Sequence, residues 1–462
     1  MNRPIDRRLF LGSSAASLGY FFSAEAFSAA RAADKPNEKL RFAGIGIGGK
    51  GSSDIDNAGN LGDVVALCDI DEGERGLGGK LKKFPKAKTY FDFRKMLDEM
   101  GKEIDAVTVS TPDHTHAPAA VMAMRMKKHV YVQKPLTHTV FEARVMREVA
   151  KKYGVCTQMG NQGSTESGLR RGIEIVQSGL IGNVSEFHVW TNRPIWPQAP
   201  KVMKRPAEEE CPKTVHWDEF IGPAPMRPYA KGYHPFAWRG WWDFGTGAIG
   251  DMACHTANMG FRALKLMYPT SIEAEAGDVN PETCPSFAHV VMDFPAREGM
   301  IACKLHWYEG QREGKKLTPP EELLKKVLNP KETLANSGSI LVGDKGILFS
   351  PNDYGAKFRL IGAGLDSINV NTPETLPVNG KGDQGQKDEW VKAILEGKPE
   401  IAFSNFDIAG PLTEAFLLGN VAIRSGKKIE WDGAKLRCTN NKDADQFIKG
   451  EYRRGWEVNA EV

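Results

Sequence analysis

The stretch Leu40-Arg-Phe-Ala-Gly-Ile-Gly-Ile-Gly-Gly-Lys-Gly51 decides the fold of this chain of 462 residues. Residues 40–45 are mostly apolar and predict a buried strand, which runs into a glycine-rich turn and then a helix. Gly46 would allow the tight turn, and Gly48 would let a pyrophosphate approach the backbone. Gly51 would let the helix pack closely on the strand. The stretch therefore predicts a dinucleotide-binding turn, with phosphate at the helix N-terminus.

An aspartate follows the next predicted strand, as this fingerprint requires. The strand at 64–68 ends at Asp69, where an acid can bind both ribose hydroxyls and repel the 2′-phosphate of NADP. NAD is therefore the expected cofactor, in preference to NADP. Two alternatives stay open. One is the register Gly44, Gly46 and Gly49, and the other is a plain glycine-rich turn beside a capping aspartate.

Strand-like and helix-like patterns alternate from residue 39 to residue 159, which is typical of a parallel, doubly wound sheet. Further along, strand-like runs with turn signals such as Gly343-Asp-Lys-Gly346 predict a large, mostly antiparallel open sheet. The expected fold class is α/β. It combines an N-terminal Rossmann dinucleotide-binding domain at 38–165 with a C-terminal α/β domain at 166–462, whose tail is helical over about 386–462.

Residues 1–32 predict an export signal rather than part of the fold. Asp6-Arg7-Arg8-Leu9-Phe10-Leu11 matches a twin-arginine signal, and Ala30-Arg31-Ala32 offers a cleavage site after a mildly apolar stretch. We expect an exported, periplasmic protein that acquires its cofactor before transport. The alternative is a disordered or membrane-anchored tail. No later stretch is apolar over about 18 residues, so no membrane span is expected.

Bulk composition excludes several kinds of partner and site. The chain is 41% hydrophobic and 26% charged, with a net charge of +3, and no basic stripe indicates a nucleic acid. The seven cysteines form no Cys-x-x-Cys pair, and several lie in apolar runs. We interpret them as structural thiols rather than a disulfide framework.

Asp251 and His255 directly follow the glycine-rich run 245–250. Their spacing is one helical turn, so both side chains would share a face, and a carboxylate beside an imidazole tunes a histidine for proton transfer. Lys134, at the end of a predicted buried strand, would add an ammonium suited to alcohol–ketone chemistry. The structural alternative for Asp251 and His255 is a helix-capping ion pair, and for Lys134 it is a strand-edge residue whose ammonium reaches the solvent. For Cys254 the alternatives are a small buried core residue or a nucleophile.

The loop Ser110-Thr-Pro-Asp-His-Thr-His116 follows the third predicted strand. At the carboxyl end of a parallel strand, such a loop is expected to line the dinucleotide crevice. An Asx-type turn that begins a helix is the structural alternative. His114 and His116 with Asp113 form only a weak metal pattern because no further ligands cluster nearby, and we expect no metal.

Together, the glycine turn with Asp69, the Thr111-Pro112 loop, Lys134-Pro135 and Gly245-Thr-Gly-Ala-Ile-Gly-Asp-Met-Ala-Cys-His255 resemble the glucose–fructose oxidoreductase / inositol dehydrogenase / MocA family over about residues 39–430. The resemblance implies NAD(P)-dependent oxidation or reduction of sugars and polyols, a C-terminal sheet used for homo-oligomers, and members secreted by a twin-arginine signal. The family's Glu-Lys-Pro corresponds here to Gln133-Lys134-Pro135, so the lysine is kept and the acid is replaced. Lys134, Asp251 and His255 are the implied catalytic residues.

The segment 190–242 is the expected substrate wall, because six of the ten tryptophans fall there and indoles stack on the C–H faces of sugar rings. Any single tryptophan is more often a core residue. The expected cofactor-binding residues are Gly46, Gly48, Gly49, Lys50, Gly51, Asp69, Ser110, Thr111, Pro112, His116, Gln133 and Lys134. The expected substrate residues are Asn161, Gln162, Trp190, Asn192, Arg193, His234, Arg239, Trp241, Trp242 and Asp243.

Three functions follow from these patterns. The first is an exported NAD-dependent enzyme that moves a hydride between nicotinamide and a carbinol carbon of a sugar, polyol or glycoside, for example at C3. There, His255 would take the hydroxyl proton and Lys134 would stabilise the oxygen, supported by Asp251. The second is a glycosidase that uses NAD for transient oxidation and elimination, whose related branch carries Tyr-Pro-Thr-His where this chain has Tyr268-Pro-Thr-Ser271. The third is a non-catalytic sugar-binding protein.

Overall fold

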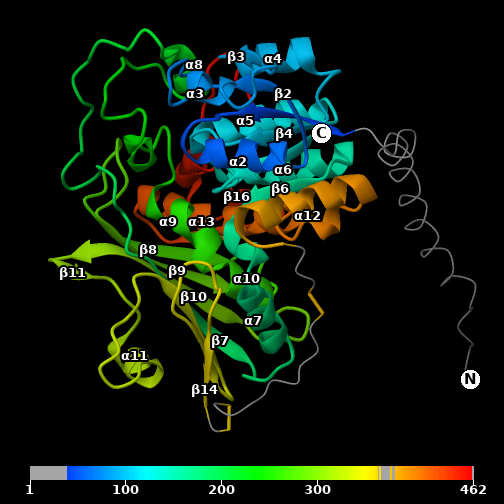
Figure 1. The fold of residues 1–462 in the computed structure, drawn as a ribbon. Helices are drawn as coiled ribbons and strands as arrows, with labels where there is room; N and C mark the ends of the chain where they lie inside the picture. Colours follow the sequence, from blue (N-terminus) through cyan, green and yellow to red (C-terminus); the bar gives the residue numbers. More distant parts are fainter. Residues whose placement is uncertain (1–38, 363, 366–374, 377–379, 460–462) are drawn as a thin grey trace, which may run out of the picture.

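The computed structural model describes residues 39–362, 364–365, 375–376 and 380–459. The predicted export signal at 1–32 lies outside the described residues. Two sheets form the frame of the molecule, and a layer of helices lies between them (Figure 1). The α/β class with a Rossmann domain and a second α/β domain is thereby confirmed.

The N-terminal sheet is wholly parallel and has the strand order β3-β2-β1-β4-β5-β6. Because the order reverses between β1 and β4, the carboxyl ends of these two strands border the crevice in which such sheets bind dinucleotides. The strands are β1 (Leu40–Ile45), β2 (Gly62–Cys68), β3 (Lys88–Tyr90), β4 (Ala106–Val109), β5 (His129–Gln133) and β6 (Thr157–Gly160). The helices of this part are α2 (Gly49–Gly59), α3 (Leu77–Leu81), α4 (Phe93–Met100), α5 (Asp113–Arg125) and α6 (Val140–Tyr153).

The C-terminal sheet is mixed and has the order β14-β13-β12-β7-β10-β9-β8-β15-β16, with β11 paired to β10. Every pair is antiparallel except β7 with β10. Its strands are β7 (Val184–Trp190), β8 (Ser271–Gly277), β9 (Phe287–Phe294), β10 (Cys303–Arg312), β11 (Lys315–Lys316), β12 (Gly338–Gly343), β13 (Ile347–Ser350), β14 (Arg359–Ile361), β15 (Ile429–Asp432) and β16 (Arg437–Cys438). The turn at 343–346 divides the predicted run 340–349 into two strands.

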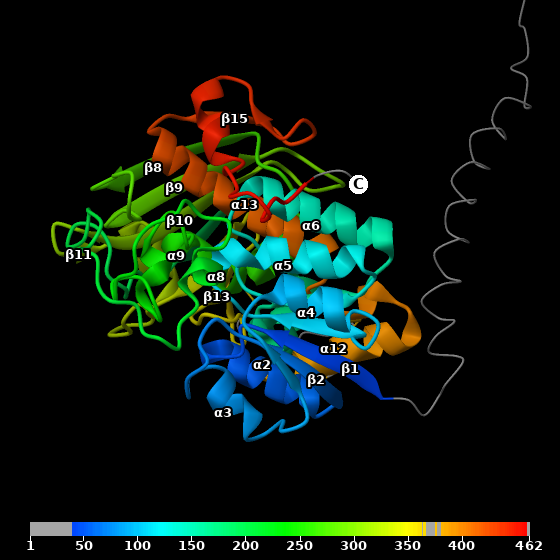
Figure 2. The same ribbon diagram turned by 90° about the horizontal axis from the view of Figure 1, so that it is seen from above.

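Helices cover this second sheet unequally. The face turned towards the Rossmann domain packs against α9 (Gly247–Thr256) and α13 (Phe406–Ser425) (Figures 1 and 2). Helix α11 (Glu321–Val327) lies against the opposite face (Figure 1). Buried and less buried residues alternate along β9, as expected for a strand with one face towards a core. The remaining helices are α7 (Ser167–Gln177), α8 (Trp217–Ile221), α10 (Asn258–Ala263) and α12 (Gly382–Glu396).

The predicted helical tail over about 386–462 is wrong beyond Ser425. Gly426, with a φ of 62°, caps α13 in the left-handed conformation that ends helices, and β15 and β16 then extend the C-terminal sheet. Helix α12 also returns to the first domain, where Trp390 packs at a ring-centroid distance of 5.9 Å from Phe42. The nucleotide-binding part therefore includes a segment more than 200 residues beyond residue 165.

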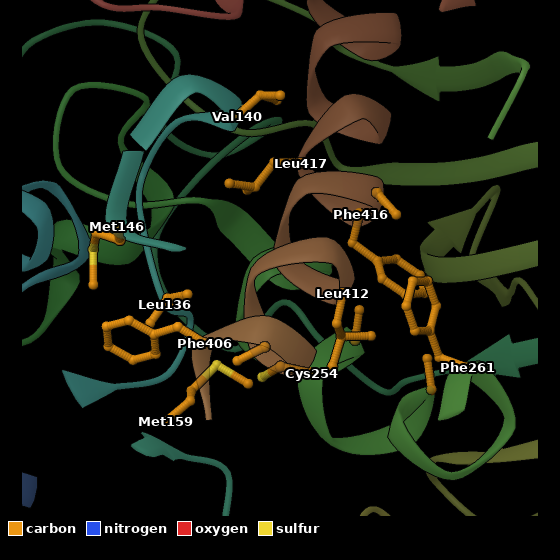
Figure 3. Close-up of a cluster of buried hydrophobic side chains, with 14 of the residues drawn as sticks. Leu136, Val140, Met146, Met159, Cys254, Phe261, Phe406, Leu412, Phe416 and Leu417 are labelled. Atoms are coloured by element: carbon orange, nitrogen blue, oxygen red, sulfur yellow. The ribbon is translucent and has the colours of Figure 1, made fainter. Parts of the chain in front are cut away.

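Helix α13 forms the centre of the shared core. Phe406, Leu412 and Phe416 lie on it among side chains from both sheets, and Cys254 of α9 packs close to them (Figure 3). Within the described residues, α13 is long and apolar enough to cross a membrane, but 89% of that window is buried inside the protein. It is therefore a core helix. All seven cysteines have free thiols, and Cys211 alone among them is not buried.

Candidate active site

A cavity of about 820 Å³ lies between the carboxyl ends of the parallel strands and the C-terminal domain. The first domain contributes the glycine turn, the end of β2, the loop after β4 and the end of β5. The second contributes 193–196, 234–239 and α9. The structure brings these sequence-predicted residues to its wall: Gly46, Gly48, Gly49, Lys50, Asp69, Ser110, Thr111, Pro112, Gln133, Lys134, Gln162, Arg193, His234, Arg239, Asp251 and His255.

The glycine turn leaves the start of α2 open to the cavity. A Cβ on Gly51 would lie 1.8 Å from the Gly46 carbonyl oxygen, and Gly46 itself has a φ of +71°. A Cβ on Gly49 would meet nothing within 4 Å. Gly48 caps the helix without a side chain, so the first N–H groups of α2 are free to bind a phosphate. These contacts correspond to the register Gly46, Gly48 and Gly51.

Asp69 lies directly beneath this turn. Its carboxylate accepts hydrogen bonds from the N–H groups of Ile47 (2.8 Å), Gly48 (2.9 Å) and Asp71 (3.0 Å). Burial raises the pKa of Asp69 to about 6, against the effect of these hydrogen bonds. The carboxylate is thus ionised at neutral pH and borders the cavity. An uncapped helix N-terminus beside a buried acid fits the pyrophosphate and ribose of NAD.

Lys134 and Asp251 meet across the domain boundary. The Lys134 Nζ atom lies 2.6 Å from Asp251 Oδ1 and 3.2 Å from the Asp251 carbonyl oxygen. Arg239 Nε lies 3.3 Å from Asp251 Oδ1, and Arg193 Nε lies 3.4 Å from Oδ2. Burial raises the pKa of Asp251, but the charges of Lys134 and Arg239 outweigh it and hold that pKa below its usual range. Asp251 is therefore a carboxylate that fixes the ammonium of Lys134.

His255 lies one turn after Asp251 on α9, as predicted, but the two side chains form no hydrogen bond. The buried His255 Nδ1 atom has no hydrogen-bond partner among the described residues. Burial, followed by the nearby charge of Lys134, lowers the pKa of His255 well below its ordinary value. The imidazole is therefore neutral at neutral pH and can accept a proton. The ring of Tyr354 packs edge-on against it at 4.9 Å.

Gln133, which replaces the family's glutamate, contacts a carboxylate from another element. Its Nε2 atom donates to Asp54 Oδ2 at 2.8 Å, and its Oε1 accepts the Lys134 N–H at 3.3 Å. Asp54, on α2, is fully buried and also pairs with Lys50 and with Lys387 of α12. The negative charge missing at position 133 therefore lies on Asp54. Sequence reasoning missed both Asp54 and Lys387, because charged helix residues are usually exposed.

Asp113 and its neighbouring histidines are held by protein groups rather than arranged for a metal. Arg239 Nη1 donates to both oxygens of Asp113, at 2.8 and 3.1 Å, and the Thr246 hydroxyl donates at 2.7 Å. His114 Nε2 lies 2.8 Å from the Phe220 carbonyl oxygen. Both ring nitrogens of His116 also contact backbone carbonyl oxygens at 2.8 Å, so His116 shapes the loop from behind and does not line the cavity.

Three of the predicted substrate tryptophans lie in the core instead of the cavity. The indole N–H of Trp190 donates to the Ala335 carbonyl, and its ring stacks on Phe349. Trp241 and Trp242 donate to the backbone in the same way and are almost fully buried. The tryptophans that line the cavity are Trp196, Trp238 and Trp456. The segment between β7 and α9 has no periodicity, so the sequence could not indicate which indoles face inward.

The remaining predicted residues outside the cavity have structural contacts. Asp243 pairs with Arg227, and Asn192 accepts a hydrogen bond from Arg193 at 2.6 Å. Asn161 donates to the Cys254 carbonyl and thereby ties the end of β6 to α9. Cys254 is buried, and this burial raises the pKa of its thiol to about 12. A thiol that stays protonated does not act as a nucleophile at neutral pH.

Comparisons with known proteins agree with this geometry. Residues 40–161 match the oxidoreductase family with an NAD-binding Rossmann fold, and residues 172–302 match the C-terminal alpha/beta domain of that family. An inositol 2-dehydrogenase of Salmonella paratyphi B is 30% identical over 148 residues, which are 31% of this chain and 43% of that protein. The aligned region thus spans less than half the length of that curated relative.

Two further proteins are similar to parts or to the fold of this chain. An alpha-N-acetylgalactosaminidase of Shewanella oneidensis is 31% identical over 157 residues, covering 32% of this chain and 34% of that protein. An inositol dehydrogenase homologue from Azotobacter vinelandii, solved with NADH and myo-inositol, shares the fold with a TM-score of 0.58 at 13% identity, over 86% of this chain and 98% of that one.

The two matched regions together cover more than half of the 462 residues, in the order and with the topology that the structure shows. The N-terminal domain is an NAD-binding Rossmann domain. The chain belongs to the glucose–fructose oxidoreductase / inositol dehydrogenase / MocA family of oxidoreductases.

Proposed function

We propose that this protein is an NAD-dependent oxidoreductase that transfers a hydride between the nicotinamide and a carbinol carbon of a sugar, polyol or glycoside. One observation carries the proposal. Lys134 Nζ lies 2.6 Å from Asp251 Oδ1, on the wall of the cavity that also contains the glycine turn and Asp69. An ammonium, a neutral imidazole and a dinucleotide cradle in one cavity are the groups that alcohol oxidation requires.

Each side chain has a separate task in this proposal. Bound NAD supplies the hydride acceptor. The Lys134 ammonium, held by Asp251, would donate a hydrogen bond to the substrate oxygen and stabilise its developing negative charge. His255 is neutral and would accept the hydroxyl proton. Asp251 is a positioning residue, because it holds Lys134 in place and stays ionised throughout.

A carbohydrate is the substrate class that the cavity wall favours. Trp196 and Trp238 line it, and the Trp196 N–H already donates to Gln198. Ile195 and Phe236 also line it and are 60% and 64% exposed, which suits an apolar group attached to the sugar. Sugar rings stack through their C–H faces on such indoles. These observations support a sugar or a glycoside.

The second candidate is a glycosidase that oxidises its substrate transiently with NAD. The alpha-N-acetylgalactosaminidase relative favours it. Tyr268, which begins the segment Tyr268-Pro-Thr-Ser271, counts against it, because its hydroxyl accepts a hydrogen bond from Arg147 and it does not line the cavity. The histidine of the related Tyr-Pro-Thr-His sequence is also absent here. We therefore favour net oxidation or reduction.

One experiment separates these candidates. The purified protein is incubated with NAD and a panel of free sugars, polyols and aryl glycosides, and both the NADH absorbance band and the released aglycone are followed. NADH that accumulates without cleavage is the expected result. Cleavage without net NADH would establish the glycosidase instead, and neither signal with any compound would contradict both enzymatic candidates.

We further propose export through the twin-arginine signal and assembly of a homo-oligomer through the C-terminal sheet. The motif at 6–11 supports export, and the outer face of the sheet beyond α11 supports assembly, because His289, Val291 and His306 are only partly buried there. Cell fractionation of wild type and of Arg7→Lys/Arg8→Lys tests the first proposal. Light scattering during size-exclusion chromatography tests the second. A cytoplasmic wild type, or a monomer, would contradict the respective proposal.

A further inference from the structure

We propose that the substrate carries a carboxylate, as a hexuronic acid or its glycoside does, and that Arg193 binds this carboxylate. The inference rests on the proposed function for the sugar ring and adds the charge of the substrate. The charges of the side chains around Asp251 do not balance.

Three cationic side chains surround Asp251. Lys134, Arg239 and Arg193 approach its oxygens to 2.6, 3.3 and 3.4 Å. Asp113 is the second carboxylate of this cluster, and Arg239 Nη1 binds it at 2.8 Å. The cluster therefore holds three positive charges and two negative charges. One positive charge is left at the end of the cavity where the substrate would bind.

Arg193 is the cation with the fewest contacts in this cluster. Lys134 is held by both the carboxylate and the carbonyl of Asp251, and Arg239 forms a two-oxygen contact with Asp113. Arg193 donates through Nη1 to Asn192, while its buried Nε atom forms no hydrogen bond. No partner is found for its Nη2 atom among the described residues, and 24% of the side chain stays exposed. The edge of its guanidinium that reaches the cavity therefore offers the Nη2 donor, because Nε is buried and lies 3.4 Å from Asp251 Oδ2.

A carboxylate is the group that matches this edge. A guanidinium binds the two oxygens of a planar carboxylate through parallel hydrogen bonds, and a monoanion neutralises the single excess charge. A phosphate dianion would leave a negative charge in a partly buried site without a partner. Asp353 also lines the cavity, but its carboxylate forms no ion pair with Arg193. Arg193 therefore has only a share of Asp251 as its counter-charge, because Lys134 and Arg239 approach the same carboxylate.

The surroundings of Arg193 orient such a substrate. Ile195 and Trp196 follow it closely in the chain and line the same wall, so an apolar surface begins beside the guanidinium. A pyranose ring could lay a C–H face on Trp196 while its carboxylate meets Arg193 and a ring hydroxyl meets Lys134. This arrangement would select sugar acids over neutral sugars of the same stereochemistry.

Equilibrium binding tests the inference with matched pairs of sugars. The full protein, loaded with NADH, is titrated calorimetrically with glucuronate and glucose, galacturonate and galactose, and mannuronate and mannose. For at least one pair we expect the acid to bind at least about tenfold more tightly than its neutral partner, as a charge-assisted hydrogen bond implies. Arg193→Gln should bring that ratio close to one, and Arg193→Lys should keep part of it. Arg75→Gln, which changes another arginine of the cavity wall, should keep the full ratio.

Several results would overturn the inference. The first is that none of the uronates binds more tightly than its neutral partner. The second is that the affinity ratio of acid to neutral sugar stays unchanged in Arg193→Gln, and the third is that glucose 6-phosphate binds more tightly than the uronates. If Arg193 only stabilised an alkoxide, Arg193→Gln would lower kcat equally for both members of a pair and leave the binding ratio intact. If the affinity ratio changes as expected but the protein shows no NAD-dependent turnover, the proposed function is refuted and the carboxylate site is supported.

Discussion

The Lys134 ammonium and the Asp251 carboxylate lie 2.6 Å apart, although Lys134 follows a strand of the Rossmann domain and Asp251 lies on a helix of the second domain. Neither domain alone contains this ion pair. Burial raises the pKa of Asp251, but the charges of Lys134 and Arg239 outweigh this effect and hold the pKa below its usual range. The geometry of the lysine therefore depends on how the two domains pack together.

Gln133→Glu, which restores the acid of the family motif, should destabilise this protein. The new carboxylate would lie where the Gln133 amide donates to buried Asp54, so two negative charges would meet. We expect a loss of roughly 1 to 3 kcal/mol in the free energy of unfolding, measured by urea denaturation. Adding Asp54→Asn should recover part of that loss, because Lys387 could then pair with the glutamate. Equal stability of Gln133→Glu and wild type would contradict this interpretation.

Asp69→Ser should change the choice of cofactor. It removes the buried carboxylate beneath the glycine turn, which would bind ribose hydroxyls and repel a 2′-phosphate. The ratio of the Kd values for NADP and NAD should fall by at least about tenfold, measured by quenching of tryptophan fluorescence. In wild type, NAD binding should weaken as the pH falls through about 6, because protonation then removes the carboxylate. Asp353→Asn, which removes another carboxylate of the cavity wall, serves as the control, and an unchanged ratio in Asp69→Ser would count against the assigned role.

His255→Ala should lower kcat by roughly 10²- to 10⁴-fold, the range of general base catalysis. The Kd for NAD should stay within about threefold of the wild-type value, because His255 lies on α9 of the second domain and not in the glycine turn that would hold the cofactor. The pKa of His255 is lowered well below its usual value, so protonation of this residue should not reduce the wild-type kcat/KM at any pH above about 6.5. Cys254→Ala, the adjacent position on α9, is the matched control and should keep its turnover. Wild-type turnover in His255→Ala would exclude it as the base.

His129 should make the folded protein sensitive to acid. Its Nδ1 atom accepts the Cys156 N–H at 2.9 Å, and burial lowers its pKa to about 4 from an ordinary value near 6.5. The unfolded chain therefore binds the proton first. The contribution of His129 to stability is complete above about pH 6.5 and falls as the pH drops towards 4, by about 3 kcal/mol in total. His129→Gln keeps an acceptor and should lose less stability than wild type between about pH 7.5 and about pH 4.5 in urea titrations. Identical losses would show that other groups dominate the acid response.

The sequence allowed the parallel sheet and the glycine turn to be predicted, because both rest on local periodicity and on where parallel strands end. The grouping of Lys134 with Asp251 was implied by the family resemblance, since the two residues belong to different domains. The sequence did not indicate Asp54 with Lys387, which are 333 residues apart and leave no local pattern. Nor could it distinguish Trp190 from Trp196. Both lie near the end of β7, and only the packing of the irregular segment after it decides which indole reaches the cavity.

The most direct test of the account is Lys134→Met, assayed on whichever compound of the sugar panel gives the strongest NADH signal. The variant removes the ammonium and keeps the apolar stem, while Asp251 keeps its contacts with Arg193 and Arg239. We predict that the NADH band fails to develop in a single turnover, with a rate at least about 10³-fold below that of wild type and an NAD affinity within about threefold. An NADH burst at the wild-type rate in Lys134→Met would contradict the assignment of this cavity as the site of hydride transfer.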